Sequence, residues 1–307
     1  MTKLKNYISF LICLIVFIAI FLNSDKIADY IKKSLRFKQE LVILPSNAYT
    51  KDDKFVTVKQ VDDYTPYNFD DLVNIYYSVL NQGWNEFTFY CPIEYDECLD
   101  DITKLSYNEV LLSDINNYVH PYNSYSSIKT LYDDMGEVTI KVNHLYSDLE
   151  IEQIDKQLDE IMAKTINDNM SEEQKIRALH DYIINLVKYD TVRGSNGTSQ
   201  YDSARILGLL IDNYAICSGY TDMMAVFLNK MDIPNFKVSS ENHVWNAVYY
   251  NGQWLHLDLT WDDPVSVTGE DILEHNYFLI NNERLDKLSE SNKEHNFDKN
   301  IYKELNY

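Results

Sequence analysis

The sequence predicts an α+β protein in which helices pack on an antiparallel sheet, preceded by a small α+β domain and an N-terminal membrane helix. Segments with the period of amphipathic helices alternate along the chain with short segments of alternating polarity. Asn251-Gly252 separates two of the alternating segments, which is the strongest short signal for a β-hairpin. We therefore expect a membrane anchor over 1–24, a stalk over 25–40, and domains over 41–147 and 148–307.

The charge of the chain argues against one class of function. Of the 307 residues, 48 are acidic and 27 are basic, so the formal net charge is −21. Nucleic-acid binding relies on Lys and Arg, which neutralise phosphates. We therefore expect no nucleic-acid partner, and any other partner to be neutral or cationic.

The N-terminal segment is predicted to meet a membrane. Lys3 and Lys5 precede an apolar run over 8–22, and this charge bias places the main domain outside the cytoplasm. As a helix the run spans roughly 22 Å, which fits a signal peptide or a short anchor. No small residues suited to cleavage follow it, so we favour an uncleaved, single-pass anchor; cleavage would give a secreted protein. Cys13, inside the run, is expected to be a buried apolar side chain.

The first domain is predicted from two helices and two strands. Apolar residues at helical spacing over 68–83 end at Gly83. A capping box from Ser106 to Glu109 predicts the start of another helix. The expected strands are 84–91 and 137–146.

Two cysteines of this domain lie close together in the sequence. Cys91 and Cys98 could close a short loop by a disulfide, which an extracytoplasmic location would permit. Sequence spacing does not give the geometry of the pair. A disulfide and two free thiols both remain open at this stage.

The second domain is predicted to open with amphipathic helices over 151–166, 171–189 and 203–213. Ser171 and Gln174 can cap the second of them, and Asn213 can end the third. This arrangement leads the chain directly to Cys217.

Cys217 is predicted to begin a helix. An apolar stripe over 220–231 follows it, and Pro234 ends the pattern. Unpaired amides and the positive end of the helix dipole favour the thiolate, which is the nucleophilic form of cysteine. A buried, unreactive cysteine is the ordinary alternative. The choice therefore depends on which side chains can reach the thiol.

The hairpin around Asn251-Gly252 supplies such side chains. A two-residue turn sets a register in which Trp245 faces Asp258 and His243 is a diagonal neighbour of Asp258. The face that they share is predicted to be polar and carries His243, Trp245, Ala247, Tyr249, Trp254, His256, Asp258 and Thr260. The opposite face is predicted to be the core face and carries Val244, Val248, Leu255, Leu257 and Leu259.

Cys217, His243 and Asp258 together have the parts of a thiol nucleophile system. The histidine can take the thiol proton, and the carboxylate can orient the imidazole. Either of the last two residues alone would be an ordinary surface group. The three in combination predict catalysis.

The sequence resembles the bacterial transglutaminase-like proteins at these residues. The resemblance is carried by three blocks in order, namely 215–220 (AICSGY), 243–246 (HVWN) and 254–264 (WLHLDLTWDDP). It extends back through 170–190 and forward to 277–283, and covers roughly 150–285.

The resemblance implies a papain-like α+β fold in which Cys217 is the nucleophile, His243 the general base and acid, and Asp258 the orienting carboxylate. Members of the family act on peptide or glutamine amides through a cysteine thioester, as transglutaminases, deamidases or peptidases, so the expected partner is a protein or peptide substrate. Ala215 stands where the family usually has glycine, and the second oxyanion donor is not identified. The candidates for substrate binding or oxyanion stabilisation are Ser218, Tyr220, Trp245 and Trp261.

Other assignments of the same residues are weaker. His256 shares the polar face but does not align with the family's base. Metal binding by His243, His256 and Asp258 lacks the close ligand pairs of zinc sites, so we expect no metal and no cofactor. A non-catalytic, membrane-tethered protein that binds a peptide or cell-wall component in the same cleft is the main alternative function. The remaining histidines are interpreted as structural: His120, His144, His180, His275 and His295.

Overall fold

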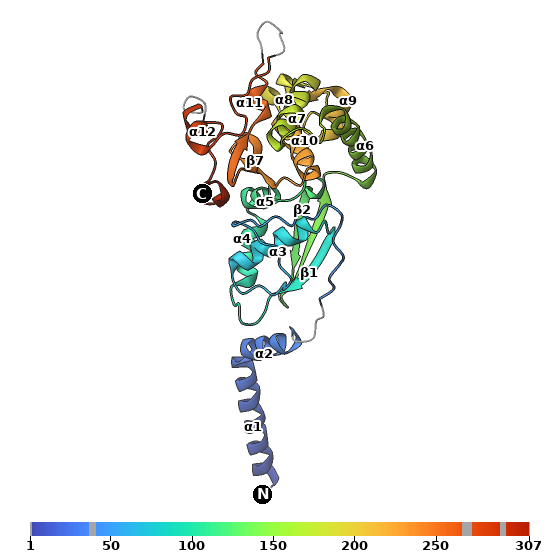
Figure 1. Cartoon of the computed structure of the whole chain (residues 1–307). Helices are drawn as coiled ribbons and strands as arrows, with labels where there is room; N and C mark the ends of the chain where they lie inside the picture. Colours follow the sequence, from blue (N-terminus) through green and yellow to red (C-terminus); the bar gives the residue numbers. More distant parts are fainter. Residues whose placement is uncertain (1, 37–40, 266–271, 289–292, 307) are drawn as a thin grey trace.

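The computed structural model describes residues 2–36, 41–265, 272–288 and 293–306 (Figure 1). Within these ranges the helices are organised by two three-stranded antiparallel sheets and one two-stranded parallel pair. The predicted α+β class, with helices and antiparallel sheets, is confirmed.

Two helices precede the sheets, α1 (Thr2–Leu22) and α2 (Ser24–Arg36). Much of the segment expected to be a stalk is therefore helical. Apolar side chains of α1 such as Phe10 and Phe21 are exposed. In the part of the chain that the structure describes, no helix combines the length and the apolar character that a membrane crossing requires. The predicted membrane helix is thus not supported.

The first unit packs helices on the sheet β1-β3-β2. The side chain of Asn68 accepts a hydrogen bond from the amide of Asp71, which fixes the start of the first of these helices. One helix and one strand of this unit, α4 and β2, were not predicted. The elements are α3 (Phe69–Asn81), β1 (Glu86–Tyr90), α4 (Cys98–Ser106), α5 (Glu109–Asn116), the 3-10 turn η1 (Pro121–Asn123), β2 (Tyr125–Tyr132) and β3 (Glu137–His144).

The predicted capping box at Ser106 is wrong. Ser106 is the last residue of α4, and its hydroxyl donates to the carbonyl of Thr103 at 3.0 Å. Asn108 caps α5 instead, because its side chain accepts from the amide of Leu111 at 3.1 Å. The Ser-x-x-Glu pattern spans the junction of two helices and therefore caps neither.

Cys91 and Cys98 form a disulfide that joins the end of β1 to the start of α4. Their Cα atoms lie 5.8 Å apart, and both side chains are buried. The disulfide, one of the two arrangements that the sequence left open, is therefore the one found.

The second unit places helices around the sheet β6-β7-β8. The capping box of Ser171 and Gln174 forms as predicted, and Asn213 ends α9 in the left-handed conformation, with φ 57°. The elements are α6 (Asp148–Thr165), α7 (Glu172–Leu186), β4 (Lys188–Tyr189), α8 (Thr191–Asn196), α9 (Ile206–Asp212), β5 (Tyr214–Ala215), α10 (Cys217–Lys230), β6 (Asn235–Ser239), β7 (Val244–Tyr250), β8 (Gln253–Leu257), α11 (Leu259–Asp262), α12 (Asn282–Leu288) and the 3-10 turn η2 (Lys303–Asn306).

The β6-β7-β8 sheet lies between two hydrophobic clusters. On one face, Val248 and Leu257 pack with apolar side chains of α6, α7, α9 and α10. On the other face, Phe236, Trp245 and Ala247 join the cluster that fills the first unit. The apolar core therefore continues across the domain boundary that the sequence placed at 147.

The C-terminal segment ties the two units together, and in Figure 1 the C-terminus lies at their junction. The carboxylate of Glu304 is buried and accepts hydrogen bonds from the amides of Val56 and Thr57, at 2.7 and 2.9 Å. It also accepts from the hydroxyl of Tyr118 at 2.9 Å. The hydroxyl of Thr57 also reaches it, at 3.0 Å, so four donors of the first unit share one carboxylate of the C-terminal segment.

Replacing Glu304 by Ala should lower the free energy of unfolding by about 2–3 kcal/mol, because buried donors are left without their acceptor. Urea unfolding of the full chain measures this difference. Glu283→Ala is the matched control, since Glu283 pairs with Lys287 at the surface of α12 and should contribute little. Equal, small effects of the two substitutions would contradict the role assigned to Glu304.

Candidate active site

Cys217 is the first residue of α10 and is partly exposed. Ile216 before it is extended, and no side chain caps the helix. The carbonyl of Ile216 accepts from the amides of Gly219 and Tyr220, so the amides of Cys217 and Ser218 are the ones that point out of the helix. A Cβ at Gly219 would lie 2.6 Å from the carbonyl oxygen of Ser203, so this turn requires glycine. The buried Ala215 fits beside Gly219, with 3.4 Å between its Cβ and the position of that added Cβ.

His243 lies immediately before β7, and its side chain is buried. Its Nε2–H donates to Oδ2 of Asp258 over 2.6 Å. Its ring stacks on Trp245, with centroids 5.6 Å apart and planes inclined by 18°. The remaining nitrogen, Nδ1, is left for Cys217, whose side chain lies near enough to raise the pKa of His243.

The charges of this site favour an ion pair between Cys217 and His243. Burial alone would lower the pKa of His243, but the carboxylate of Asp258 and the thiol of Cys217 outweigh burial and raise this pKa to about 10. The imidazole therefore stays protonated through neutral pH. An imidazolium beside a thiol at a helix N-terminus stabilises the thiolate.

Asp258 is the N-cap residue of α11 and is only 1% exposed. Its Oδ1 accepts from the amides of Thr260 and Trp261, at 3.0 and 3.3 Å. Its Oδ2 accepts from His243 and from Nε2 of His295, at 2.6 and 2.7 Å. Burial alone would raise the pKa of Asp258, but the two histidines hold it far below its ordinary value. The carboxylate therefore stays ionised.

The predicted hairpin register forms, but its ladder is shorter than predicted. Tyr250 pairs with Gln253, and the pairing continues to Asn246 and Leu257, where β8 ends. Asp258 caps a helix instead of facing Trp245 on a strand, because its carboxylate takes the first amides of α11.

The face of the hairpin that was predicted to be polar is in fact largely buried. Trp245, Ala247 and His256 are each inaccessible to solvent. The first unit and the C-terminal segment cover this face, and neither could be placed from the hairpin pattern.

His295 is a member of the site that sequence reasoning missed. Its ring lies 4.9 Å from that of Trp245 and 5.0 Å from that of Tyr277, and it donates to Asp258 as described above. It was interpreted as structural because no motif surrounds it. It comes from a segment 37 residues after Asp258, so no local spacing signals the contact.

Tyr189 also lies at the site and was not predicted. It ends β4, which pairs in parallel with β5 so that Tyr189 faces Ala215, two residues before the nucleophile. Burial and the nearby charge of Cys217 raise the pKa of Tyr189. The phenol therefore stays neutral and keeps its O–H as a possible donor.

The four additional candidates divide into two groups. Tyr220 and Trp245 are fully buried, so substrate cannot reach them; Tyr220 donates to Asp263 and Trp245 to His256. Ser218 and Trp261 are partly exposed. Ser218 donates to the carbonyl of Ala204 at 3.1 Å, and Trp261 donates to Glu294 at 3.2 Å.

His256 has both ring nitrogens engaged away from the thiol. Nδ1 accepts from Trp245 at 2.9 Å, and Nε2–H donates to Asn282 at 2.8 Å. Burial lowers the pKa of His256 to about 4, so the ring is neutral. These contacts fit a structural role in the core.

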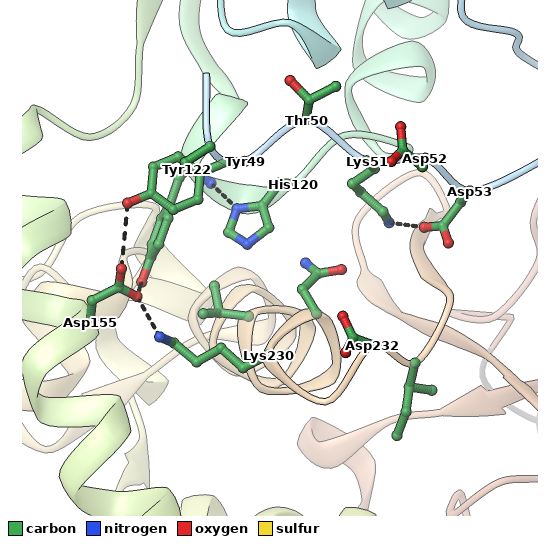
Figure 2. Close-up of a pocket in the computed structure, with 14 residues that line it drawn as sticks. Tyr49, Thr50, Lys51, Asp52, Asp53, His120, Tyr122, Asp155, Lys230 and Asp232 are labelled. Carbon is green, nitrogen blue, oxygen red and sulfur yellow. Dashed lines mark hydrogen bonds and ion pairs between the residues drawn. The ribbon is translucent and has the colours of Figure 1, made fainter. Parts of the chain in front are cut away.

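A cavity of about 470 Å³ lies at the C-terminal end of α10, the end opposite Cys217. Figure 2 shows the side chains that line it. Its basic side chains are paired: Lys51 with Asp53 at 3.1 Å, and Lys230 with Asp155 at 2.9 Å. Because it lies at the far end of α10, this cavity is separate from Cys217, His243 and Asp258, which we call the catalytic set.

A second cavity, of about 310 Å³, lies between the two units. Its lining includes Ser218 and Val244, which follow Cys217 and His243 in the chain, and Ser113, Asn116 and Tyr125 of the first unit. The first unit thus forms part of the wall of a cleft that reaches the chain neighbours of the nucleophile and the histidine.

A comparison with protein families finds a match in the region that holds Cys217, His243 and Asp258. Residues 159–259 match the model of the transglutaminase-like superfamily, and this range contains Cys217, His243 and Asp258. This part of the chain is therefore similar to the transglutaminase-like superfamily. No curated protein matches the chain.

Three solved structures are similar to parts of the chain. One is described as a TGase, with 14% identity and a TM-score of 0.35 over 48% of this chain and 46% of that one. A candidate cysteine protease from Cytophaga hutchinsonii has 17% identity, coverages of 48% and 65%, and a TM-score of 0.28. A candidate protease from Parabacteroides distasonis has 17% identity, coverages of 49% and 41%, and a TM-score of 0.25. The chain thus spans less than two thirds of each of these structures.

Alkylation of Cys217 by iodoacetamide should be fast at pH 6 in the parent protein, because His243 is protonated and stabilises the thiolate. His243→Ala should remove the fast reaction, so that alkylation becomes appreciable only near pH 8.5, as for an ordinary thiol. Mass spectrometry of the Cys217 peptide across pH 5–9 gives the rates. Identical profiles in the two proteins would contradict the ion pair.

Removing His295 should narrow the pH range of the same reaction. In His295→Ala, Asp258 loses a contact that fixes its position, so His243 is held less firmly beside Cys217 and stabilises the thiolate less; the acid limb of the alkylation profile should therefore move up by about one pH unit. His295→Gln keeps an N–H donor and should restore most of the parent profile, which a purely structural role would not produce. An unchanged acid limb in His295→Ala would show that His295 does not position Asp258.

Proposed function

We propose that this chain is an extracytoplasmic thiol enzyme that acts on peptide or glutamine amides through a thioester on Cys217. The observation that carries the proposal is the arrangement in which Cys217 begins α10 near His243, and His243 donates to the ionised, buried Asp258. Each residue has the neighbour that its role requires.

The reaction follows from these contacts. The thiolate of Cys217 attacks the amide carbon, and the carbonyl electrons move to oxygen. The imidazolium of His243 gives its proton to the leaving nitrogen, the C–N bond breaks, and ammonia or an amine departs. Water or a second amine then attacks the thioester and gives its proton to His243, and the C–S bond breaks to restore the thiolate. Water gives a deamidase or peptidase, and an amine gives a transglutaminase.

The negative oxygen of the intermediate needs donors that are already in place. The amide of Cys217 is the first, since it lies in the uncapped first turn of α10. We assign the second to the phenol of Tyr189, because it is neutral and because Tyr189 pairs with Ala215, two residues before Cys217. No sequence spacing predicted this donor, because β4 meets β5 only in the fold.

The substrate we propose is a protein or peptide. The cleft between the two units has polar groups of the first unit on one wall, including Ser113 and Asn116. Such groups can pair with a peptide backbone, so the first unit would take part in substrate choice.

Location outside the cytoplasm is part of the proposal. The Cys91–Cys98 disulfide supports it, since such bonds persist mainly in oxidising compartments. Attachment to a membrane through residues 1–24 rests on the sequence pattern alone.

The test is to incubate the full chain with glutamine-containing peptides and a biotinylated primary amine. The Cys217 peptide should gain the mass of the substrate less ammonia, and ammonia or biotinylated peptide should accumulate. Cys217→Ala should abolish both signals. Cys13→Ala is the matched control, because it removes the other free cysteine and should leave turnover unchanged.

One result would contradict the proposal. Fast alkylation of Cys217 without any adduct, ammonia or cleaved peptide would refute amide turnover. Retained peptide binding in that case would favour the non-catalytic binding protein.

A further inference from the structure

A second cluster of histidine and carboxylate groups lies outside the catalytic set. His180 and Asp181 are neighbours on α7, and His275 comes from the segment before α12. Oδ1 of Asp181 lies 2.8 Å from Nδ1 of His180 and 2.7 Å from Nε2 of His275. All three atoms are within 4.8 Å of one another. Both histidines therefore have partners that no spacing in the sequence predicts.

His180 is held in the way that proteins hold metal-binding histidines. Its Nε2 lies 3.2 Å from Oδ2 of Asp262, and both of these side chains are inaccessible to solvent. Asp262 is fixed in turn, since its Oδ1 accepts from the amide of Tyr277 at 2.9 Å. A carboxylate on the far nitrogen orients the ring and makes the near nitrogen a better ligand.

The geometry of this cluster leaves a place for a cation. Nδ1 of His180 and Nε2 of His275 both lie within 2.8 Å of the same oxygen of Asp181, so three ligand atoms from two segments converge on one point.

We propose that His180, Asp181 and His275 bind a divalent transition-metal ion such as Zn²⁺. Two imidazoles and a carboxylate suit zinc better than magnesium or calcium, which prefer oxygen ligands. Zinc bonds of about 2.0–2.1 Å require ligand atoms roughly 3.3 Å apart, so the cluster needs to open by about half an ångström. Asp181 and His275 are each one-third exposed, which gives the ion an entry path and a site for a water ligand.

The ion would act as a structural brace. Asp262, which holds His180, ends the same short helix α11 that Asp258 begins. Metal binding would therefore fix α11 at its far end and stabilise the fold around the catalytic carboxylate. No step of the proposed reaction uses the ion, so this proposal stands independently of the proposed function.

The experiment titrates Zn²⁺ into the full chain by calorimetry and follows Tm with and without the ion. All proteins carry Cys217→Ala, so that the active-site thiol does not bind zinc. His275→Ala and Asp181→Asn each remove one partly exposed ligand. Two variants are used so that the test still holds if one of them does not fold. His144→Ala is the control, since it removes an imidazole of β3 outside both histidine clusters.

One Zn²⁺ should bind per chain and raise Tm by about 5 °C at a hundredfold excess over Kd. The two ligand variants should lose at least about tenfold in affinity, and the His144→Ala control should bind like its parent. Absence of binding in the parent would overturn the proposal and leave a proton-linked network. Binding that survives in His275→Ala and Asp181→Asn would also overturn it, and would point to His243, Asp258 and His295.

Discussion

The buried carboxylate of Asp258 is the group on which the rest of the site depends. A buried charge costs several kcal/mol unless donors surround it. Asp258 receives four, namely two amides of α11, His243 from the start of β7, and His295 from the C-terminal segment. These donors come from three separate segments, so the fold can bury this charge only by bringing His243 and His295 to Asp258. The contacts that stabilise the buried charge are therefore the same contacts that position His243.

The first unit belongs to this arrangement and is more than a spacer. It covers the sheet face that carries Trp245 and Ala247, which would otherwise be a large exposed apolar surface. It also supplies Asn116 to the cleft between the two units. An isolated second unit would lose both its second core and one wall of its cleft.

Local features were predictable from the sequence, and contacts between distant segments were not. Periodicity gave α3, α7 and α10, and the Asn251-Gly252 turn gave the hairpin register, because each depends on neighbouring residues. The strand pairing is shorter than predicted because Asp258 caps α11 instead of continuing β8, and the alternating pattern does not predict this cap. His295 and Tyr189 reach the site only through the tertiary fold, so no spacing could have identified them.

The contacts of the C-terminal segment bear on the order in which this protein folds. Tyr302 reaches Asp114 across 188 residues, and Glu304 reaches Thr57 across 247. Closing loops of this length costs chain entropy before the contact can stabilise the chain, so such contacts form more slowly than local ones. We expect the helices and the hairpin to form first and the C-terminal contacts last. His295 lies in the same late segment, so a newly made chain should gain its fully supported nucleophile only in the final stage of folding.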